Sequence, residues 1–487
     1  KRLKGKIFNV VVLTSNQKSD DYLVDILKKH KIEFYRGDLK NVYKRFLNYS
    51  KNLQKDDVII RATADNPFVD YSFVSNILKK FLKNNEIYRG IDFKKHNLPY
   101  GMSIEIIRKE LLLKYKNNIN TQSAEHVTSL FYKYQSQEII NKVRFKKQNS
   151  NLRCTIDTFN DYKKINFVFN KFRNPLTVPW WKLINILLKY KHRESCYLPK
   201  SKYILGGAQI GDNYANFKKL DIKKILKKKL FLKNFSSIDT AFNYLQSHKN
   251  ISKVQSNKMI NIITKLNYSD INICKNYYKE NFYINFYQIL ITLNQNKLDT
   301  LLIHNYNDFK KNHKSILKIF KNLQSLKLIK NYGVSIYHPK ELLFLMKNFF
   351  NLSIQIPVNF IDFRWDEINI KSLKKKSKST LIGRSIFLRG KLLLKNGYIE
   401  NYKINNIFLK TLSSIKKKHT IKSNLELCIK YVNSLSYLNH IVIGFENYSQ
   451  IKQVMRHKNK KFTRNLTKII SKQFKFLNTK YIDLRKI

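Results

Sequence analysis

The chain has 487 residues, of which 43% are hydrophobic and 13% aromatic, so it holds enough apolar material for two or three packed domains and wholesale disorder is excluded. Its 94 Lys and Arg residues outnumber 33 Asp and Glu residues and give a formal net charge of +61. No apolar run approaches the roughly 18 residues of a membrane span, so no membrane partner is expected. The four cysteines lie far apart without a C-x-x-C pair, which argues against a disulfide framework or a zinc site and favours a cytoplasmic protein.

The first 175 residues alternate short apolar runs with amphipathic helical stretches. The pattern predicts a helix at Tyr71–Leu82 and strands at Val10–Thr14, Val58–Arg61, Ile104–Ile107 and Leu152–Ile156. This alternation is typical of an α/β domain, which is placed at residues 1–175.

Two aspartates stand at the ends of predicted strands in this domain. Asp65 lies in RATADNPFVD, and Asp157 follows LRCTI. Aspartates in such places are often turn or cap residues, and that interpretation stays open. Alternatively, two carboxylates from different strands hold Mg²⁺, which leaves its other positions to substrate phosphates, as nucleotidyl transfer requires.

The same domain resembles the sugar cytidylyltransferases of the spore coat polysaccharide biosynthesis protein F type, relatives of the CMP-Kdo and CMP-acylneuraminate synthetases. The resemblance is carried in order by VVVLTSNQKSDD (10–21), EFYRGDLKNVYKRF (33–46), RATADNPFVD (61–70), PYGMSIEII (99–107), AEHVTSLFY (124–132) and LRCTIDTFNDY (152–162). It implies a Rossmann-like nucleotidyltransferase fold, a homodimer formed through this domain, and CTP and an acidic or modified sugar as substrates.

The resemblance also implies roles for individual residues. Asp65 and Asp157 match the metal ligands, and the sugar side is matched by Arg61, Glu105, Glu125 and His126. Ala64 replaces the glycine usual beside the metal aspartate. Relatives begin with a Gly/Arg/Lys-rich loop that holds the base and triphosphate, and this sequence starts after it, so a complete CTP site is expected to need that additional segment.

A change of pattern marks the end of the first domain. Residues 174–202 contain a Pro-bounded amphipathic helix followed by a charged, loop-like stretch, so residues 176–200 are assigned to a helix and linker. Beyond it, eight strand candidates alternate with helical stretches, clearest at 314–328, 340–349 and 423–438. The strand candidates are YILGGAQ, FSSIDT, NIITKL, TLLIH, YGVSI, LSIQIPV, TLIGRSI and HIVIGF. Eight such units over about 250 residues predict a (β/α)8 barrel at residues 201–487.

Polar residues that follow barrel strands are candidates for chemistry, because barrel active sites lie at the carboxyl ends of the strands. Asp239, Lys265 and His304 occupy such positions, and Tyr244 follows Asp239 by five residues. Taken singly, Asp239 fits a helix cap, His304 a core histidine, and Lys265 is one lysine among many. Together they make chemical sense, because a tyrosine acts as an acid at neutral pH only beside a cation, and a carboxylate keeps a buried lysine charged.

Residues 200–487 resemble the aldo/keto reductases. The resemblance is carried by LGGAQIG (205–211), IDTAFNY (238–244), ITKL (263–266), LLIH (301–304), GVSIYHPKEL (333–342), QIPVN (355–359) and IVIGFENYSQIKQV (441–454). It implies reduction of a carbonyl substrate such as a keto-sugar by NADPH, or NADH, with Asp239, Tyr244, Lys265 and His304 as the catalytic tetrad.

The cofactor positions carry over less evenly. Ser335 and Gln355 match the residues that hold the nicotinamide carboxamide, and the Gly444–Gln450 segment matches the loop that receives the adenosine-side phosphates. Ile336 stands where Asn is usual, and Arg384 stands where an aromatic residue usually stacks on the nicotinamide. An arginine plane can stack on a ring, but it adds charge at this place.

The sequence therefore predicts a fusion enzyme of surface polysaccharide or activated acidic sugar synthesis. The alternative is a polyanion- or nucleic-acid-binding protein built on decayed enzyme folds, for which the charge of +61 would be the function. The lysines are spread over the whole chain, and Asn, Ile, Tyr and Phe, which share A/T-rich codons, are also abundant. Compositional drift explains this pattern, and no specific nucleic-acid partner is expected.

Overall fold

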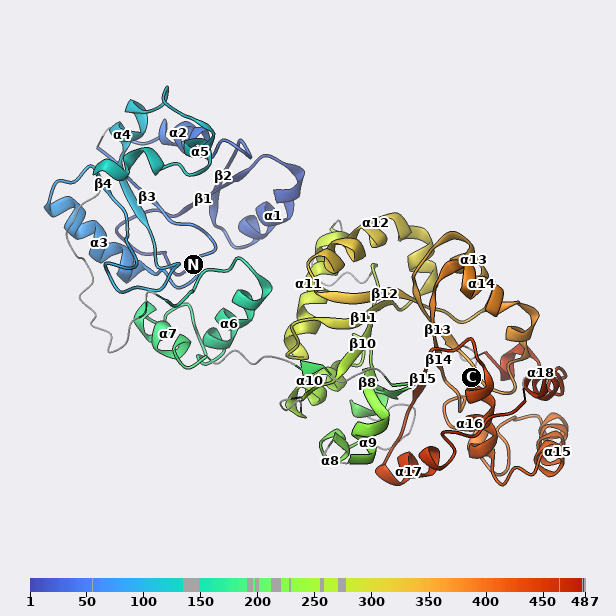
Figure 1. Cartoon of the computed structure of the whole chain (residues 1–487). Coiled ribbons are helices and arrows are strands. Elements are labelled where there is room, and N and C mark those ends of the chain that lie inside the picture. The colour runs from blue at the N-terminus through green and yellow to red at the C-terminus, as the bar shows by residue number, and fades with distance from the viewer. Residues whose placement is uncertain are drawn as a thin grey trace. The chain divides into compact units, whose positions relative to one another are not determined.

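The computed structural model describes residues 1–54, 56–134, 149, 151–190, 196–197, 201–211, 220–226, 229–254, 258–269, 277–463, 465–483 and 485. The chain divides into two units, Lys1–His192 and Arg193–Ile487 (Figure 1). Both units mix helices and strands, as the sequence predicts. Within the described ranges, no helix combines the length and the apolarity needed to cross a bilayer.

The first unit contains two small sheets with helices packed around them. β1 (Val11–Ser15) pairs in parallel with β2 (Glu33–Gly37), and β5 (Glu105–Arg108) lies between β3 (Val58–Arg61) and β4 (Tyr88–Arg89) in an antiparallel sheet. The helices are α1 (Asp21–Lys29), α2 (Val42–Ser50), α3 (Tyr71–Lys83), α4 (Lys109–Lys114), α5 (Thr121–Glu125), α6 (Phe159–Phe169) and α7 (Trp180–Leu187).

The predicted strand at Leu152–Ile156 is wrong, because its only ladder contact in the described chain is a single parallel bridge between Tyr100 and Arg153. Tyr100 stands between Pro99, which has no amide hydrogen, and Gly101, which has a φ of +100°. These neighbours turn the partner chain away after one residue pair, so a buried apolar run cannot extend into a strand. The segment still passes beside Asp65, because Ile156 N donates to Asp65 O at 2.9 Å.

Helix α3 packs against α7, the helix that the sequence places in the connection between domains. Asp70 joins the two N-termini, since its carboxylate accepts hydrogen bonds from Phe73 N and from Trp180 N, both at 2.8 Å. The rings of Phe73 and Trp180 meet edge to face with centroids 5.2 Å apart. Helix α7 therefore contributes its apolar face to the core of the first unit.

The second unit is a closed barrel of eight parallel strands, which confirms the predicted fold. The strands follow one another around the barrel as β7 (Tyr203–Gly206), β8 (Phe235–Asp239), β10 (Asn261–Leu266), β11 (Leu298–Ile303), β12 (Ile329–Ser335), β13 (Ser353–Pro357), β14 (Thr380–Arg384) and β15 (His440–Ile443). Each coincides with one of the eight predicted strands. Its interior is filled by apolar side chains, among them Ile204, Ile263, Leu302, Ile382 and Val442.

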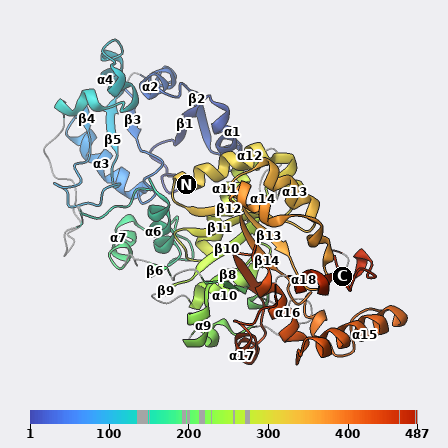
Figure 2. The same ribbon diagram turned by 45° about the vertical axis from the view of Figure 1, so that its right-hand side comes forward.

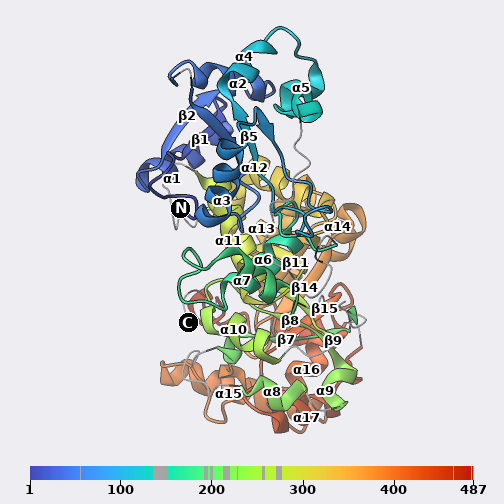
Figure 3. The same ribbon diagram turned by 90° about the vertical axis from the view of Figure 1, so that its left-hand side faces the viewer.

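Helices cover the outside of the barrel, as the ribbon shows when it is turned by 45° and by 90° (Figures 2 and 3). They are α8 (Ile222–Leu226), α9 (Lys229–Asn234), α10 (Leu245–Val254), α11 (Tyr278–Thr292), α12 (Tyr306–Ser325), α13 (Pro339–Asn348), α14 (Ile370–Ser377), α15 (Tyr402–Lys418), α16 (Asn424–Ser434), α17 (Tyr448–Arg456) and α18 (Leu466–Lys472). A short parallel pair, β6 (Cys196–Tyr197) with β9 (Lys258–Met259), lies outside the barrel sheet. The helices predicted around 314–328, 340–349 and 423–438 are confirmed as α12, α13 and α16.

Candidate active sites

A cavity of about 920 Å³ opens where the barrel strands end, within the size range of small-molecule sites. All four residues predicted as catalytic line it, together with part of the predicted cofactor set; these are Asp239, Tyr244, Lys265, His304, Ser335, Arg384, Gly444 and Gln450. Asp239, Lys265, Ser335 and Arg384 lie at or near the ends of β8, β10, β12 and β14, and His304 directly follows β11. Parallel strands deliver their last side chains to one end of a barrel, so residues far apart in sequence meet there.

Lys265 and Asp239 form a buried ion pair in this cavity. Lys265 Nζ lies 2.8 Å from both carboxylate oxygens of Asp239 and donates to Thr240 O at 3.0 Å. Burial lowers the pKa of Lys265, and the Asp239 carboxylate opposes that shift. The pair is therefore arranged to keep a cation in a site where desolvation disfavours one.

The glycines of the LGGAQIG motif permit this arrangement. Gly207 N donates to Asp239 O at 2.7 Å, and a Cβ at residue 207 would lie only 2.8 Å from that oxygen. The end of β7 thus approaches the end of β8 more closely than a side chain at this position would allow.

Tyr244 stands on the short segment between β8 and α10. Its amide donates to Ala241 O at 3.0 Å, and Ser247 N donates to its carbonyl oxygen at 2.8 Å, so the turn that carries it is fixed at both ends. The side chain contributes to the cavity lining.

His304 is held at the cavity by its backbone amide, which donates to Leu266 O at 3.2 Å. Burial, and then the positive charges of Lys265 and Arg384, lower the pKa of His304 to about 4. His304 is therefore neutral at pH 7, and a neutral imidazole has one N–H to donate and one nitrogen that accepts.

The buried His248 on α10 gives the stability of the fold a pH dependence that does not involve the cavity residues. Burial lowers the pKa of His248 to about 4, whereas a histidine in the unfolded chain titrates near 6.5. The folded state therefore resists protonation, so its stability is complete above pH 6.5 and is lost as the pH falls from 6.5 towards 4.

The unfolding free energy of the wild type decreases when the pH is lowered from 7 to 4.5. We expect this decrease to be about 2–3 kcal/mol smaller in His248→Gln, which lacks the buried imidazole. Urea unfolding followed by circular dichroism at both pH values measures this difference. The exposed Gln288 on α11 is the control position, because Gln288→Asn replaces one non-ionisable side chain by another and should leave the pH dependence as it is in the wild type. An equal loss in the wild type and in His248→Gln would contradict the expectation.

Of the two residues predicted to hold the carboxamide, one lines the cavity and the other does not. Ser335 lines the cavity, whereas Gln355 is completely buried behind it. Gln355 Nε2 donates to Asp239 Oδ1 at 2.9 Å, and Ser335 Oγ donates to Gln355 Oε1 at 3.4 Å. Gln355 is thus a hydrogen-bond partner of the Asp239–Lys265 pair, which sequence reasoning did not foresee.

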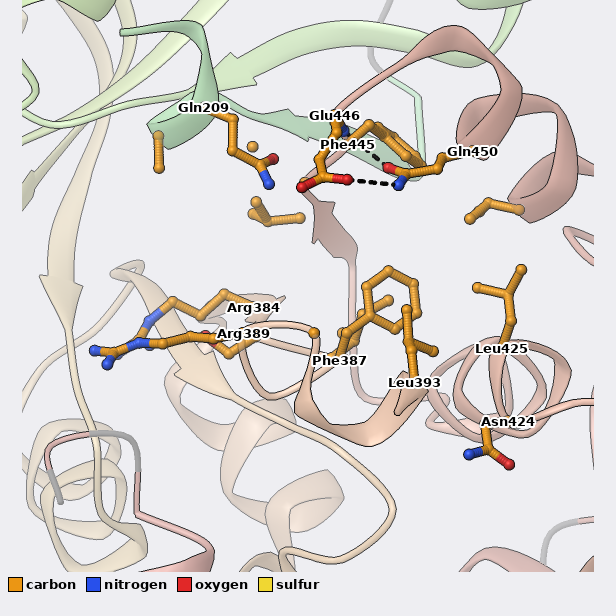
Figure 4. A pocket seen from close by; sticks show the side chains of 18 of the residues that line it. Gln209, Arg384, Phe387, Arg389, Leu393, Asn424, Leu425, Phe445, Glu446 and Gln450 are labelled. Carbon is orange, nitrogen blue, oxygen red and sulfur yellow. Dashed lines mark hydrogen bonds between the residues drawn. The ribbon is translucent and has the colours of Figure 1, made fainter. Parts of the chain in front are cut away.

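The Gly444–Gln450 segment forms another wall of the cavity (Figure 4). Gln450 is tied to Glu446 twice, since Glu446 N donates to Gln450 Oε1 at 2.8 Å and Gln450 Nε2 donates to Glu446 Oε2 at 3.0 Å. Asn447 caps helix α17 by accepting from Gln450 N at 3.0 Å. These contacts fix the loop between β15 and α17.

Sequence reasoning missed several charged residues of the cavity wall, which are Arg389, Lys395, Lys416, Lys422 and Glu446. Basic residues occur throughout the chain, so the sequence offers no reason to single out these four as residues of a site. Glu446 could have been identified as a candidate from the sequence, because it is an acidic residue in a basic chain and lies inside the motif IVIGFENYSQIKQV (441–454).

In the first unit, the structure brings the segments of Asp65 and Asp157 together. Thr155 Oγ donates to Asp65 Oδ2 at 3.2 Å, whereas Asp65 Oδ1 is buried and has no hydrogen-bond partner in the described chain. Asp157 is half exposed and forms an ion pair with Arg153. A buried carboxylate oxygen without a donor in the described chain, approached by the segment that carries a second carboxylate, fits one edge of a Mg²⁺ site completed by substrate phosphates.

The four sugar-side candidates separate into two groups. Arg61 Nη1 lies 2.5 Å from Glu105 Oε2 across the β3–β5 pair, and Tyr88 and Thr128 also donate to Glu105. Glu125 and His126 are exposed and stand just before Thr128 in the chain. Together with the described groups around Asp65 and Asp157, they form no cluster of three or more His, Cys, Asp or Glu side chains that could bind a metal.

The barrel and its cavity place the second unit among barrel enzymes, whose chemistry lies at the carboxyl ends of the strands. Comparison with family models narrows this class. Residues 202–473 match the model of the aldo/keto reductase family, which is more than half of the chain, so the chain belongs to that family. Residues 2–173 match the cytidylyltransferase model. The protein is a fusion of an N-terminal cytidylyltransferase domain with a C-terminal aldo/keto reductase domain.

Relatives are found for each part. An uncharacterized protein of Methanocaldococcus jannaschii is 31% identical over 164 residues, which are 32% of this chain and 64% of that protein. The spore coat polysaccharide biosynthesis protein SpsF of Bacillus subtilis is 29% identical over 187 residues, or 37% of this chain and 74% of that protein. The holo form of aldo-keto reductase AKR11C1 from Bacillus halodurans aligns with 58% of this chain and 96% of its own, at 18% identity and a TM-score of 0.45.

Proposed function

We propose that the barrel reduces the carbonyl group of a sugar-derived substrate with NADPH, and that the N-terminal domain activates a sugar with CTP, both in the cytoplasm. The observation that supports the first activity is the Asp239–Lys265 ion pair in one cavity with Tyr244 and His304. The similarity to SpsF supports a place in the synthesis of a surface polysaccharide or an activated acidic sugar. We also infer a homodimer formed through the N-terminal domain.

Three features of the cavity support binding of a nicotinamide dinucleotide. Its volume is about 920 Å³, the hydroxyl-bearing Ser335 is part of its lining, and the loop before α17 presents Gly444, which has no side chain. When bound there, the cofactor supplies a hydride to the carbonyl carbon. The remaining requirement is a proton for the carbonyl oxygen, together with groups that stabilise negative charge as it develops there.

The four cavity residues can meet this requirement. The Tyr244 hydroxyl donates the proton, and the ammonium group of Lys265 stabilises the phenolate that remains. Asp239 keeps Lys265 protonated, and Gln355 in turn orients Asp239. Neutral His304 donates one hydrogen bond to the carbonyl oxygen and thereby fixes the direction of that oxygen.

Cofactor binding and turnover test this proposal directly. We expect the purified chain to bind NADPH in a fluorescence titration and to consume it, measured at 340 nm, when an aldehyde such as 4-carboxybenzaldehyde is added. A reaction without aldehyde is the control for unspecific oxidation, and a parallel titration with NADH compares the two cofactors. Absence of binding to both cofactors would refute the proposed activity of the barrel.

For the N-terminal domain, we propose that Asp65 and Asp157 hold Mg²⁺ and that Arg61, Glu105, Glu125 and His126 lie on the sugar side. The support is the buried Oδ1 of Asp65, which has no hydrogen-bond partner among the described residues, and the close approach of the Thr155–Asp157 segment to Asp65. Bound Mg²⁺ would neutralise charge on the triphosphate, while the two carboxylates would hold the metal ion in position. The experiment on this site is a measurement of metal binding, which does not require the sugar to be known.

A further inference from the structure

The half-buried guanidinium of Arg384 in the cavity has no anionic partner among the residues that the structure describes. Within the described part of the chain, no carboxylate oxygen lies within 4.0 Å of the Arg384 guanidinium, although most other arginines at comparable depth are paired. Arg384 is half-buried and lines the cavity. A guanidinium in such a position usually faces a carboxylate or a phosphate, because removing its charge from water is otherwise costly.

Its neighbours hold the guanidinium in place without neutralising it. Nη2 donates to Ile336 O at 3.0 Å, and Nη1 donates to Ser385 Oγ at 3.3 Å. Cζ lies 4.3 Å from the centre of the Tyr337 ring. These two bonds use two of the five N–H groups of a guanidinium, so the others remain available to a ligand.

A second arginine at the same ring shows the contrast. Arg485 lies with its Cζ 5.3 Å from the centre of the Tyr337 ring, and it is paired with Asp483 at 2.6 Å. Asp483 also pairs with Arg364. Of the two guanidinium groups that contact Tyr337, only the one that lines the cavity lacks a carboxylate.

The charge of Arg384 acts on the residues proposed to be catalytic, since it contributes to lowering the pKa of both Lys265 and His304. Figure 4 shows the Arg384 and Arg389 side chains extending to the same side of the cavity, away from Leu393 and Leu425. The ionisable cavity residues include six cations, Lys265, Arg384, Arg389, Lys395, Lys416 and Lys422, but only two carboxylates, Asp239 and Glu446. The cavity lining as a whole thus carries more positive than negative charge, and Arg384 adds to that charge beside Lys265 and His304.

We propose that Arg384 binds a carboxylate on the carbonyl substrate, so that the barrel is specific for oxo acids, including acidic sugars in their open-chain carbonyl form. This inference rests on the proposed carbonyl reduction. It gives Arg384 a role as the residue that determines specificity. A planar guanidinium matches the two oxygens of a carboxylate, which a neutral aldehyde or ketone cannot offer. The same chemistry would also bind a phosphate group of the cofactor, and the experiment separates the two sources.

The test compares 4-carboxybenzaldehyde with its neutral methyl ester, methyl 4-formylbenzoate, at saturating NADPH. We expect kcat/KM of the wild type to favour the acid about 10–100-fold, the usual worth of a hydrogen-bonded ion contact. Arg384→Gln should bring this ratio close to one, and Arg384→Lys should retain part of it. Arg456→Gln removes the same charge from an exposed position on α17 that does not line the cavity, and it should leave the ratio unchanged.

Two further readouts make the outcome decisive. The NADPH dissociation constant of Arg384→Gln separates a substrate contact from a cofactor contact, since Arg384 stands where an aromatic residue of the family stacks on the nicotinamide. An increase of at most about twofold is expected if the guanidinium binds the substrate. A large increase with an unchanged substrate ratio would assign Arg384 to the nicotinamide ring or to a cofactor phosphate and overturn the inference. The binding of 4-(hydroxymethyl)benzoate to the cofactor-loaded protein, measured by calorimetry, is independent of turnover. It should weaken at least about tenfold in Arg384→Gln, and equal binding would also overturn the inference. Failure of the wild type to bind either NADPH or NADH would instead refute the proposed activity itself.

Discussion

Replacement of Tyr244 by Phe is expected to lower kcat by two to four orders of magnitude, the usual contribution of a general acid. The phenyl ring retains the shape of the side chain and removes only the proton that the carbonyl oxygen requires. The dissociation constant of NADPH should therefore remain that of the wild type. Stopped-flow measurement of NADPH oxidation and a fluorescence titration of the same protein give the two quantities.

The exposed Tyr402 at the start of α15 supplies the matched control, because Tyr402→Phe removes the same hydroxyl from a side chain that is 77% exposed and lies outside the cavity lining. That variant should turn over at the wild-type rate. If Tyr244→Phe also keeps its rate, the proton comes from another group, and the proposed role of Tyr244 is wrong.

The second large effect is expected in the N-terminal domain. Asp65→Ala should weaken Mn²⁺ or Mg²⁺ binding by more than the roughly 10–100-fold that outer-shell partners contribute, because it removes a proposed ligand. Asp157→Ala should also weaken metal binding. The Asp157→Ala substitution additionally releases Arg153 from its ion pair with Asp157, so the measured change combines the loss of a ligand with the loss of that ion pair. Electron paramagnetic resonance of free Mn²⁺ during a titration measures the affinity of each protein.

Asp56→Ala is the control for this experiment, since it removes an exposed carboxylate of the same unit away from the proposed ligands. It should leave metal affinity unchanged. Unaltered Mn²⁺ binding in Asp65→Ala would show that the buried Oδ1 of that residue does not face a metal. That outcome would remove the proposed metal role from the N-terminal domain and leave the barrel chemistry untouched.

These predictions differ in how far they could be made without the structure. The positions of Asp239, Lys265 and His304 at strand ends could be predicted, because apolar strands and amphipathic helices have a local periodicity that the sequence carries directly. The contact of Lys265 with Asp239 follows from the pairing of β8 with β10 in a closed barrel, which was also predicted. The strand predicted at Leu152–Ile156 was wrong, because an apolar run is compatible with any buried segment.

The amino-acid sequence is sufficient to predict the two α/β domains, the eight strands of the barrel and the residue types at their carboxyl ends, since each depends on local pattern and on motifs in a fixed order. The partner of each polar group is set by the three-dimensional arrangement of the chain. Gln355 contacts Asp239 across 116 residues, and Arg384 and Arg485 both contact Tyr337. Asp65 has one carboxylate oxygen without a partner in the part of the chain that the structure describes. Such contacts depend on strand register and side-chain direction between distant segments, and no local property of the chain encodes them.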